Sequence, residues 1–182
     1  MKKYLFFLFI LLCTNPVAAS IKENIIQNLE NIKNLSFNFE QNINGKIENG
    51  NCQLEYPKKI FCNYNLKNKK KLVSNGRSLV IKTTNSFYIY PIEKTPLNLI
   101  LDKEFLLDKI KNFSEIDIDN KYINFIFFEN ENEINIFFDK KNYNLIGWQT
   151  TDIYQNLSIT FLNSIKKNQK FKKNLFRLPT QN

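Results

Sequence analysis

The sequence predicts a mainly β domain with a few helices, in which an antiparallel meander curls into a barrel or half-barrel. Three observations support this class. Short segments of alternating apolar and polar residues follow one another closely through most of the chain. Helical spacing is confined to residues 20–34 and to two short pieces near residue 100. The 182 residues include 17 Phe and 8 Tyr but only 4 Gly and 5 Pro, a composition typical of a compact globular protein.

The first nineteen residues are expected to be a signal peptide. Lys2 and Lys3 form a basic start, residues 4–13 are an apolar run, and Ala19 ends a small-residue stretch suited to cleavage. The run is too short to span a bilayer, which needs about 20 apolar residues. Cys13 follows Leu12, whereas a lipidated cysteine usually follows a small residue, so it is expected to remain within the signal peptide. We therefore predict export, with residues 20–182 forming a single domain.

A helix is expected at the start of this domain, and strands follow it. Apolar residues recur at helical spacing from Ile21 to Ile32, and Ser20 with Glu23 three residues later is a capping box. After residue 34 the period changes to two. Strands are expected over residues 35–40, 46–56, 60–66, 71–74, 77–82, 86–90, 115–118, 122–128, 133–138, 146–152 and 157–162.

Two short helices are expected between the sixth and seventh of these strands. Thr95 is the predicted N-cap of the first, and Pro96 is its first residue. Leu97, Ile100 and Leu101 form the apolar stripe of this helix, and residues 104–112 form the second helix.

Cys52 and Cys62 would remain after cleavage of the signal peptide. They lie on the same apolar face of a predicted hairpin, about equally far from its turn at residues 57–59. Opposed strand residues come within disulfide range, and export favours oxidation. A disulfide is therefore favoured over two buried thiols.

Composition excludes several kinds of function. The chain has no His, so a Ser-His-Asp or Cys-His nucleophile and an imidazole metal site are excluded. No catalytic constellation is present, and we expect neither an enzyme nor a bound metal or cofactor. The net charge of +9 and the basic run at residues 67–71 allow nucleic-acid binding. However, Lys is abundant together with Asn and Ile, all three encoded largely by A/T-rich codons, so the run is interpreted as a solvated loop and no nucleic-acid partner is expected.

The predicted sheet has more apolar surface than three short helices can cover. One face is lined by residues such as Ile123, Phe125 and Phe127, and by the alternating set Leu157, Ile159 and Phe161. An ordinary core between sheet and helices would explain this surface. A partly unfilled interior that holds an apolar ligand is the alternative.

Five stretches of the chain resemble the LolA family of periplasmic lipoprotein carriers. The segment Phe37-Asn38-Phe39-Glu40-Gln41 resembles the family's Phe-x-Gln strand, and residues 50–64 resemble its proline-containing hairpin. Residues 72–79 (LVSNGRSL) are similar to its Val-Ser-Asp-Gly-Lys-x-Leu turn. Residues 95–101 look like its Thr-Pro lid helix, and residues 176–179 fit its closing Phe-x-x-Pro segment.

The resemblance implies an incompletely closed antiparallel β-barrel (half-barrel) covered by a helical lid over an apolar cavity. It also implies a monomeric periplasmic carrier that takes lipoproteins from a LolCDE-type ABC transporter of the inner membrane to the outer membrane, with or without a LolB-type receptor. The lid is assigned to Pro96, Leu97, Ile100 and Leu101. The acyl-chain cavity is assigned to Phe37, Phe39, Leu54, Tyr56, Ile60, Tyr64, Leu79, Phe87, Ile89, Phe125, Phe127, Ile136, Phe138, Trp148 and Ile159.

The resemblance departs from the family pattern at one functional position. Tyr56 stands where family members usually have an Arg that latches the lid. A phenol can donate one hydrogen bond to a carbonyl at a helix end, so we expect Tyr56 to lie beneath the lid. A LolB-like receptor, which would require a lipidated cysteine, and a lipid-binding stress-sensor module of similar fold remain the alternative functions.

Overall fold

The computed structural model describes residues 20–112, 115–118, 121–129, 132–151 and 155–181. The predicted signal peptide therefore lies outside the described residues. Within them, no helix is both long and apolar enough to cross a membrane. The helical elements are α1 (Ile21–Glu30), the 3-10 helix η1 (Ile92–Lys94), α2 (Leu97–Ile100) and α3 (Lys103–Asn112). The strands are β1 (Asn34–Ile43), β2 (Lys46–Glu55), β3 (Lys59–Tyr64), β4 (Lys71–Asn75), β5 (Ser78–Lys82), β6 (Phe87–Pro91), β7 (Glu115–Ile118), β8 (Tyr122–Glu129), β9 (Asn132–Asp139), β10 (Leu145–Thr151) and β11 (Leu157–Lys167).

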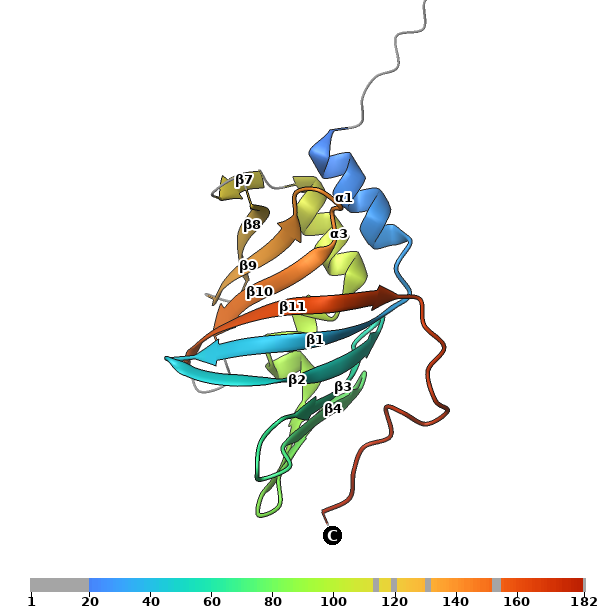
Figure 1. Ribbon diagram of the computed structural model, residues 1–182, viewed down its shortest axis with the longest axis vertical. Coiled ribbons are helices and arrows are strands. Elements are labelled where there is room, and N and C mark those ends of the chain that lie inside the picture. The colour runs from blue at the N-terminus through green and yellow to red at the C-terminus, as the bar shows by residue number, and fades with distance from the viewer. Residues whose placement is uncertain (1–19, 113–114, 119–120, 130–131, 152–154, 182) are drawn as a thin grey trace, which may run out of the picture.

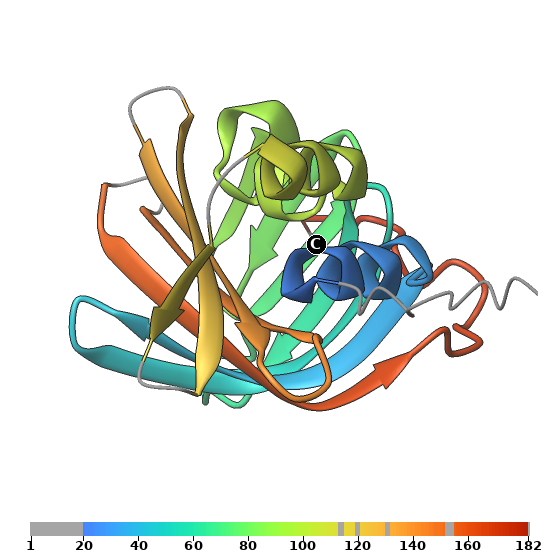
Figure 2. The same ribbon diagram turned by 90° about the horizontal axis from the view of Figure 1, so that it is seen from above.

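All eleven strands belong to one antiparallel sheet (Figure 1). Its order is β6-β5-β4-β3-β2-β1-β11-β10-β9-β8-β7, so every neighbouring pair except β1 and β11 is also consecutive along the chain. The sheet curls around the helices, which lie on its concave side (Figure 2). Because β6 and β7 form its two edges and do not pair with each other, the barrel is incompletely closed, as predicted.

Helix α1 begins where the capping box predicts. The Glu23 backbone N–H donates to the Ser20 hydroxyl (3.2 Å), and the Ser20 N–H donates to the Glu23 carboxylate (2.7 Å). Ile25 and Leu29 bury the apolar stripe of the helix. Its last turn is tied to α3, because the Lys103 ammonium donates to the carbonyl of Glu30 (3.1 Å). Helix α1 ends at Glu30, before the end of the predicted range at residue 34, because β1 already begins at Asn34.

The inward face of β11 is the reverse of the one predicted. Ser158, Thr160 and Leu162 are buried on the concave side, whereas Leu157 and Phe161 are 46% and 41% exposed on the convex side. Antiparallel pairing with β1 sets this orientation, because Phe39 of β1 faces inward and is directly opposite Leu162. The prediction for Ile159, which alternates with these buried residues, is therefore wrong.

The convex side of β11 has an aromatic contact of its own, which explains the misleading pattern. The rings of Phe137 and Phe161 stack with centroids 5.5 Å apart, on the two strands that flank Gly147 of β10. A Cβ atom on Gly147 would lie 3.2 Å from each ring and 2.4 Å from the Thr160 carbonyl oxygen. The absence of a side chain at this position therefore lets the two rings meet. The alternating apolar residues of β11, including Phe161, therefore face the convex side of the sheet.

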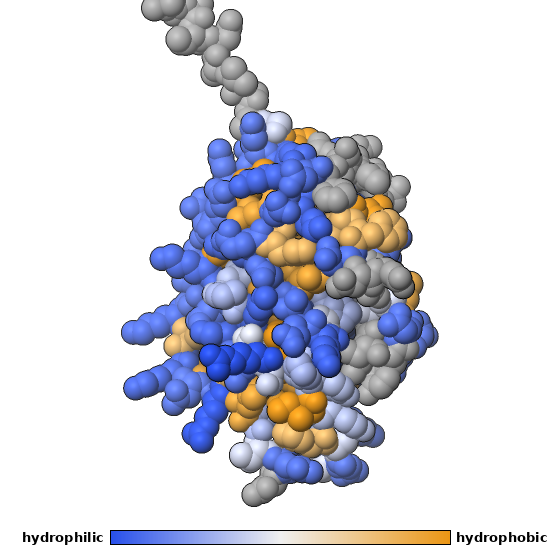
Figure 3. All heavy atoms as spheres, turned by 180° about the vertical axis from the view of Figure 1, so that it is seen from behind, coloured by the Kyte–Doolittle hydropathy of each residue, from blue (hydrophilic) through white to orange (hydrophobic). Residues whose placement is uncertain are grey.

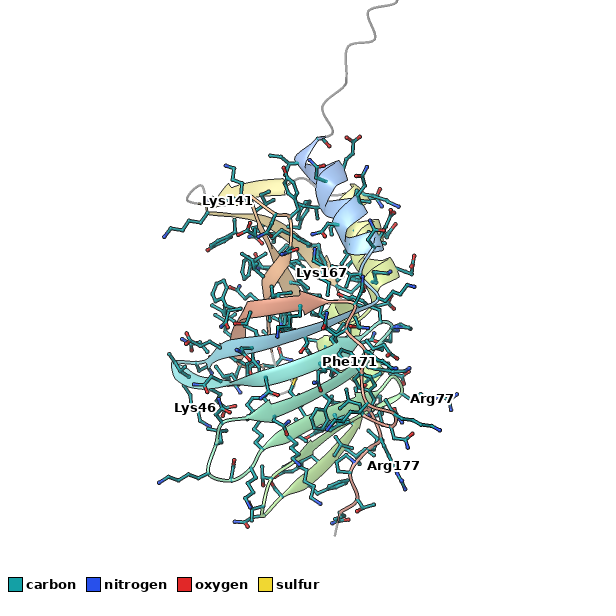
Figure 4. All side chains as sticks on the ribbon, turned by 45° about the vertical axis from the view of Figure 1, so that its right-hand side comes forward. Lys46, Arg77, Lys141, Lys167, Phe171 and Arg177 are labelled. Carbon is teal, nitrogen blue, oxygen red and sulfur yellow. A yellow bond between two sulfur atoms is a disulfide. The ribbon has the colours of Figure 1, made fainter. Side chains whose placement is uncertain are left out.

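The segment that follows β11 runs back along the outside of the sheet, past the ends of several strands (Figure 4). The Asn34 side-chain amide donates to the carbonyl of Gln169 (3.0 Å) at the start of β1. At its far end, the Lys82 ammonium of β5 donates to the carbonyl of Thr180 (2.6 Å). These contacts attach the segment to the middle of the sheet and to β5, the strand next to one edge.

The two cysteines form the predicted disulfide across the β2–β3 hairpin. Cys52 and Cys62 are directly opposite each other, with Cα atoms 4.1 Å apart. Both side chains lie on the concave face and are buried. The bridge fixes the pairing of the strands that flank the hairpin turn.

We expect alkylation in denaturant without reductant to label neither Cys52 nor Cys62. Replacing both by Ala should lower the free energy of unfolding by a little under about 3 kcal/mol, because the cross-link spans a sequence separation of only 10. Chemical denaturation of the oxidised, reduced and double-Ala proteins measures this difference. Stoichiometric labelling of the unreduced protein would contradict the disulfide.

Candidate functional site

A cavity of about 300 Å³ lies between the concave face of the sheet and the short helix α2. Side chains from nine elements line it, which are β1 to β6, β10, β11 and the α2 region. Its apolar lining consists of Phe37, Phe39, Ile43, Cys52, Ile60, Cys62, Leu72, Leu79, Ile81, Tyr88, Pro96, Leu97 and Trp148. Its polar lining consists of Gln41, Tyr64, Lys70, Thr95, Thr150, Thr151, Ser158 and Thr160.

Aromatic side chains form the floor of the cavity. Phe37 and Trp148 meet edge to face with centroids 6.5 Å apart, and Phe39 meets Tyr64 in the same way at 4.9 Å. The second pair lies on the strands that flank Gly50. A Cβ atom on Gly50 would lie 2.9 Å from the Phe39 ring, so the glycine makes room for this contact. The floor of the cavity is therefore built from two pairs of aromatic rings, and the rings of each pair pack against each other.

The lining includes six of the residues assigned to the cavity from sequence. These are Phe37, Phe39, Ile60, Tyr64, Leu79 and Trp148. Another five lie on the concave side but are buried in the core instead, namely Leu54, Phe125, Phe127, Ile136 and Phe138. The helices account for the difference, since Phe127 packs edge to face against Phe105 of α3 at 5.6 Å. Core and cavity thus share one face of the sheet, and the helices fill only part of it.

The assignments on β6 are wrong. Tyr88 lines the cavity, so Phe87 and Ile89, its neighbours in the strand, point to the opposite side. Ile89 is 57% exposed. Figure 3 shows apolar side chains on the surface in the lower part of the view, where β5 and β6 form one edge of the sheet. Every residue of β6 from Phe87 to Tyr90 is aromatic or aliphatic, so the sequence has no alternation that could indicate the inward face.

The four residues assigned to the lid are divided between the cavity and the core. Pro96 and Leu97 contribute to the lining, whereas Ile100 and Leu101 are fully buried in the core. The predicted N-cap is also wrong, because the Thr95 hydroxyl donates to the carbonyl of Ile92 (2.8 Å) instead of capping α2.

The Tyr56 hydroxyl makes no hydrogen bond to the α2 region in the part of the chain that the structure describes. That hydroxyl is buried and has no hydrogen-bond partner among the described residues, and burial raises the pKa of Tyr56, so the phenol stays protonated. The predicted hydrogen bond to a helix-end carbonyl is made by Lys58 instead, whose backbone N–H donates to the carbonyl of Leu101 (2.8 Å). The Lys58 ammonium also pairs with Asp102 at 3.0 Å. Sequence reasoning missed both residues, although they carry opposite charges beside the hairpin turn and the lid.

A buried carboxylate lies next to the polar part of the cavity. Glu48 of β2 is 3% exposed and pairs with Lys46 and Lys70, one lysine at each carboxylate oxygen. Burial by itself would raise the pKa of Glu48, but the hydrogen bonds and charges of the two lysines outweigh it and lower that pKa. Lys70 also lies over the Tyr64 ring, 4.1 Å from its centroid. It is therefore turned inward, contrary to the expected solvated loop.

We expect Glu48→Gln to lower the free energy of unfolding at pH 7 by roughly 1–3 kcal/mol, because two ammonium groups lose a charged acceptor. A carboxyl whose folded-state pKa is lowered stabilises the fold above its ordinary pKa of 4.5, and this contribution is lost as the pH falls through the folded-state value. The wild type should therefore lose stability below pH 4.5 more steeply than the variant. Glu40→Gln, on the exposed face of β1, is the matched control. Parallel pH curves for wild type and Glu48→Gln would refute this role.

Comparisons with known proteins identify a family and a similar fold. The model of the family described as outer membrane lipoprotein carrier protein LolA matches residues 30–179. No curated protein matches the chain. An uncharacterized conserved protein from Thermus thermophilus has a similar fold, with a TM-score of 0.51 and 8% identity over 88% of this chain and 93% of that one.

Two further solved structures align over similar lengths. A LolA superfamily protein from Nitrosomonas europaea has a TM-score of 0.45 and 6% identity, covering 88% of this chain and 99% of that one. The lipoprotein LppX of Mycobacterium tuberculosis has a TM-score of 0.43 and 10% identity, covering 82% and 97%. The family model spans the chain from the end of α1 through the sheet, the lid and the C-terminal segment, and the chain therefore belongs to the LolA family.

Proposed function

We propose that this protein is a monomeric periplasmic carrier that sequesters the acyl chains of lipoproteins in its cavity. It accepts them from a LolCDE-type ABC transporter of the inner membrane and delivers them to the outer membrane, where a LolB-type receptor is the expected acceptor. The observation that carries this proposal is an apolar cavity left open beneath a helical lid, in a chain of the LolA family.

The energetics of acyl-chain transfer require such a cavity. A buried methylene gains about 0.8 kcal/mol, so a sixteen-carbon chain gains roughly 12 kcal/mol on leaving water. A carrier must match much of this gain and still release the chain. Walls of aromatic and aliphatic side chains supply non-directional contacts, which allow several chain positions and do not hold the ligand at one point.

Uptake of more than one chain requires the lid to move. The cavity of about 300 Å³ is at the lower end of the roughly 300–1,000 Å³ found for ligand sites. We assign lid movement to α2 and the residues around it, because they connect the cavity wall to the core. Displacement of Leu97 would widen the cavity, whereas Ile100 and Leu101 would have to leave the core for the lid to open fully.

The closed lid is held by Lys58 of the β2–β3 turn. Its backbone N–H bonds the Leu101 carbonyl, and its ammonium pairs with Asp102 directly after it. The Ser74 hydroxyl donates to the Lys58 carbonyl (2.7 Å), which fixes the turn to β4. Lys58 and Asp102 keep 29% and 25% of their side chains exposed, so this ion pair is weak enough to be broken during uptake.

A photo-crosslinking residue at Phe39 is expected to capture lipoprotein when the protein is purified from its own periplasm. The same residue at Ile89 is the control, since it lies outside the cavity on a neighbouring part of the sheet and is 57% exposed. Mass spectrometry of the cross-linked product identifies the acylated peptide. Equal capture at both positions would contradict acyl-chain binding in the cavity.

Lys58→Met and Asp102→Asn should each increase the rate of uptake of a fluorescent acyl probe by about two- to fivefold. This range corresponds to the loss of a partly exposed ion pair worth less than about 1 kcal/mol. Stopped-flow fluorescence measures the rate, and the double variant should be no faster than either single variant. Lys59→Met is the matched control, because the adjacent Lys59 pairs with Glu55 and not with the lid. A rate equal to that of the control would rule out the Lys58–Asp102 ion pair as a latch.

A further inference from the structure

The cavity has one polar wall that an apolar ligand does not explain. It consists of Gln41 of β1, Thr150 of β10, and Ser158 and Thr160 of β11, all of which line the cavity. The strands are adjacent, and Thr160 lies directly opposite Gln41, while Ser158 lies directly opposite Thr150. The four side chains therefore form one continuous patch, which we call the polar wall. The three hydroxyl residues are 3–6% exposed, and burying hydroxyl groups against hydrocarbon is unfavourable unless they find partners.

The internal hydrogen bonds of the polar wall leave donors for a ligand. The Gln41 amide N–H groups donate to the hydroxyl oxygens of Ser158 (2.9 Å) and Thr160 (3.2 Å). Since these oxygens act as acceptors, each hydroxyl still has its own proton to donate. The hydroxyl of Thr150 has no hydrogen-bond partner in the described part of the chain. The polar wall can thus present three O–H donors to a bound molecule.

The donors of the polar wall are uncharged. Tyr64, whose hydroxyl lies 3.4 Å from the Gln41 carbonyl oxygen, also stays neutral, because burial, together with the nearby Glu48 carboxylate, raises its pKa. Lys70 is the cation that lines the cavity among the described residues, and it already pairs with Glu48. A ligand carboxylate would have to displace Glu48 from Lys70 and then lie next to it. The charge arrangement therefore disfavours an acid.

We propose that the polar wall binds the carbonyl oxygens of ester- or amide-linked acyl chains, so that the cavity selects acylated glycerol-type lipids over free fatty acids. This inference rests on the proposed carrier function and names the part of the ligand that the cavity recognises. The acyl chains lie against Phe37, Trp148 and Leu97, and the carbonyl groups where the chains join accept hydrogen bonds from Thr150, Ser158 and Thr160. A carbonyl oxygen has two lone pairs and no proton, which suits neutral hydroxyl donors.

Matched ester and ether lipids test this directly. The probes are a dipalmitoyl glycerol, the dihexadecyl glycerol ether with the same chain length but no carbonyl groups, and palmitate, each measured by displacement of a fluorescent acyl probe at neutral pH. We expect the wild type to bind the ester at least about tenfold more tightly than the ether, because a site that hydrogen-bonds a ligand discriminates strongly against an analogue that lacks the acceptor. We also expect palmitate to bind more weakly than the ester.

Substitutions assign the preference to the polar wall. The triple variant Gln41→Leu, Thr150→Val, Thr160→Val keeps Ser158 as its one remaining hydroxyl donor, so it should lose most of the ester preference and bind the ether at least as well as the wild type does. Gln149→Leu is the matched control, because this residue is on β10 beside Thr150 but does not line the cavity. It should keep the wild-type preference. If the triple variant fails to fold, as judged by its thermal transition, the comparison of probes on the wild type still decides.

The outcomes separate this inference from the proposed function. If the wild type binds ester and ether equally, or binds palmitate more tightly than the ester, the polar wall does not recognise carbonyl groups, although the carrier function stands. If the triple variant folds and keeps the full ester preference of the wild type, the recognition lies elsewhere and the inference is wrong. If none of the three lipids binds, the proposed function fails as well.

Discussion

The pairing of β1 with β11 is the constraint on which the rest of the structure depends. Every other neighbouring pair in the sheet joins strands that are consecutive in the chain, so the β1–β11 ladder alone connects the N-terminal half of the sheet to the C-terminal half. It also orients β11, because the inward position of Phe39 requires Leu162 to face inward. Gln41 is thereby placed opposite Thr160. The polar part of the cavity could not form without this one non-local contact.

The cavity exists because the helices cover only part of the apolar face of the sheet. The curled sheet presents a long apolar face with α1 and α3 on its concave side, and Phe125, Phe127 and Phe138 lie in the buried cluster to which both helices contribute. The short helix α2 covers the remainder only at its edge, through Pro96 and Leu97. Native cores are normally packed without voids larger than a water molecule, so an apolar space of this size has a cost in stability. A bound acyl chain would offset that cost, since it supplies the missing contacts.

The two ends of this site make different demands on a ligand. Contacts with Phe37, Trp148 and Leu97 depend on buried area and tolerate many chain positions, which favours release as much as uptake. Hydrogen bonds at the polar wall are directional, and they would fix where the chains are joined without using a charged anchor. Lys70 and Glu48 neutralise each other beside this wall. Such a division would allow a carrier to recognise the acylated end of any lipoprotein while remaining indifferent to the protein attached to it.

Local physical chemistry allowed much of the fold to be predicted from the sequence. The capping box placed the start of α1, the period-two segments located the strands, and the spacing of Cys52 and Cys62 from one turn predicted their disulfide. These features depend on neighbouring residues or on a single hairpin, so the sequence contains the necessary information. The motif order from Phe37 to Pro179 likewise indicated the family that the comparisons show.

Only the tertiary structure decided which face of each strand is interior and which part of that face remains open. The alternation on β11 predicts Ile159 to be inward with the other apolar residues, but the inner side of this strand is the polar one, with Ser158 and Thr160. On β6 both sides carry apolar residues, so alternation cannot identify the inner side, and Ile89 faces outward. Leu54 and Phe125 belong to the core and not to the cavity, since they lie in one buried cluster with Leu29 of α1 and Leu106 of α3. The contact of Lys58 with the lid joins residues more than forty positions apart. The sequence determines the local elements and their alternation, whereas pairing and packing between distant elements determine the site.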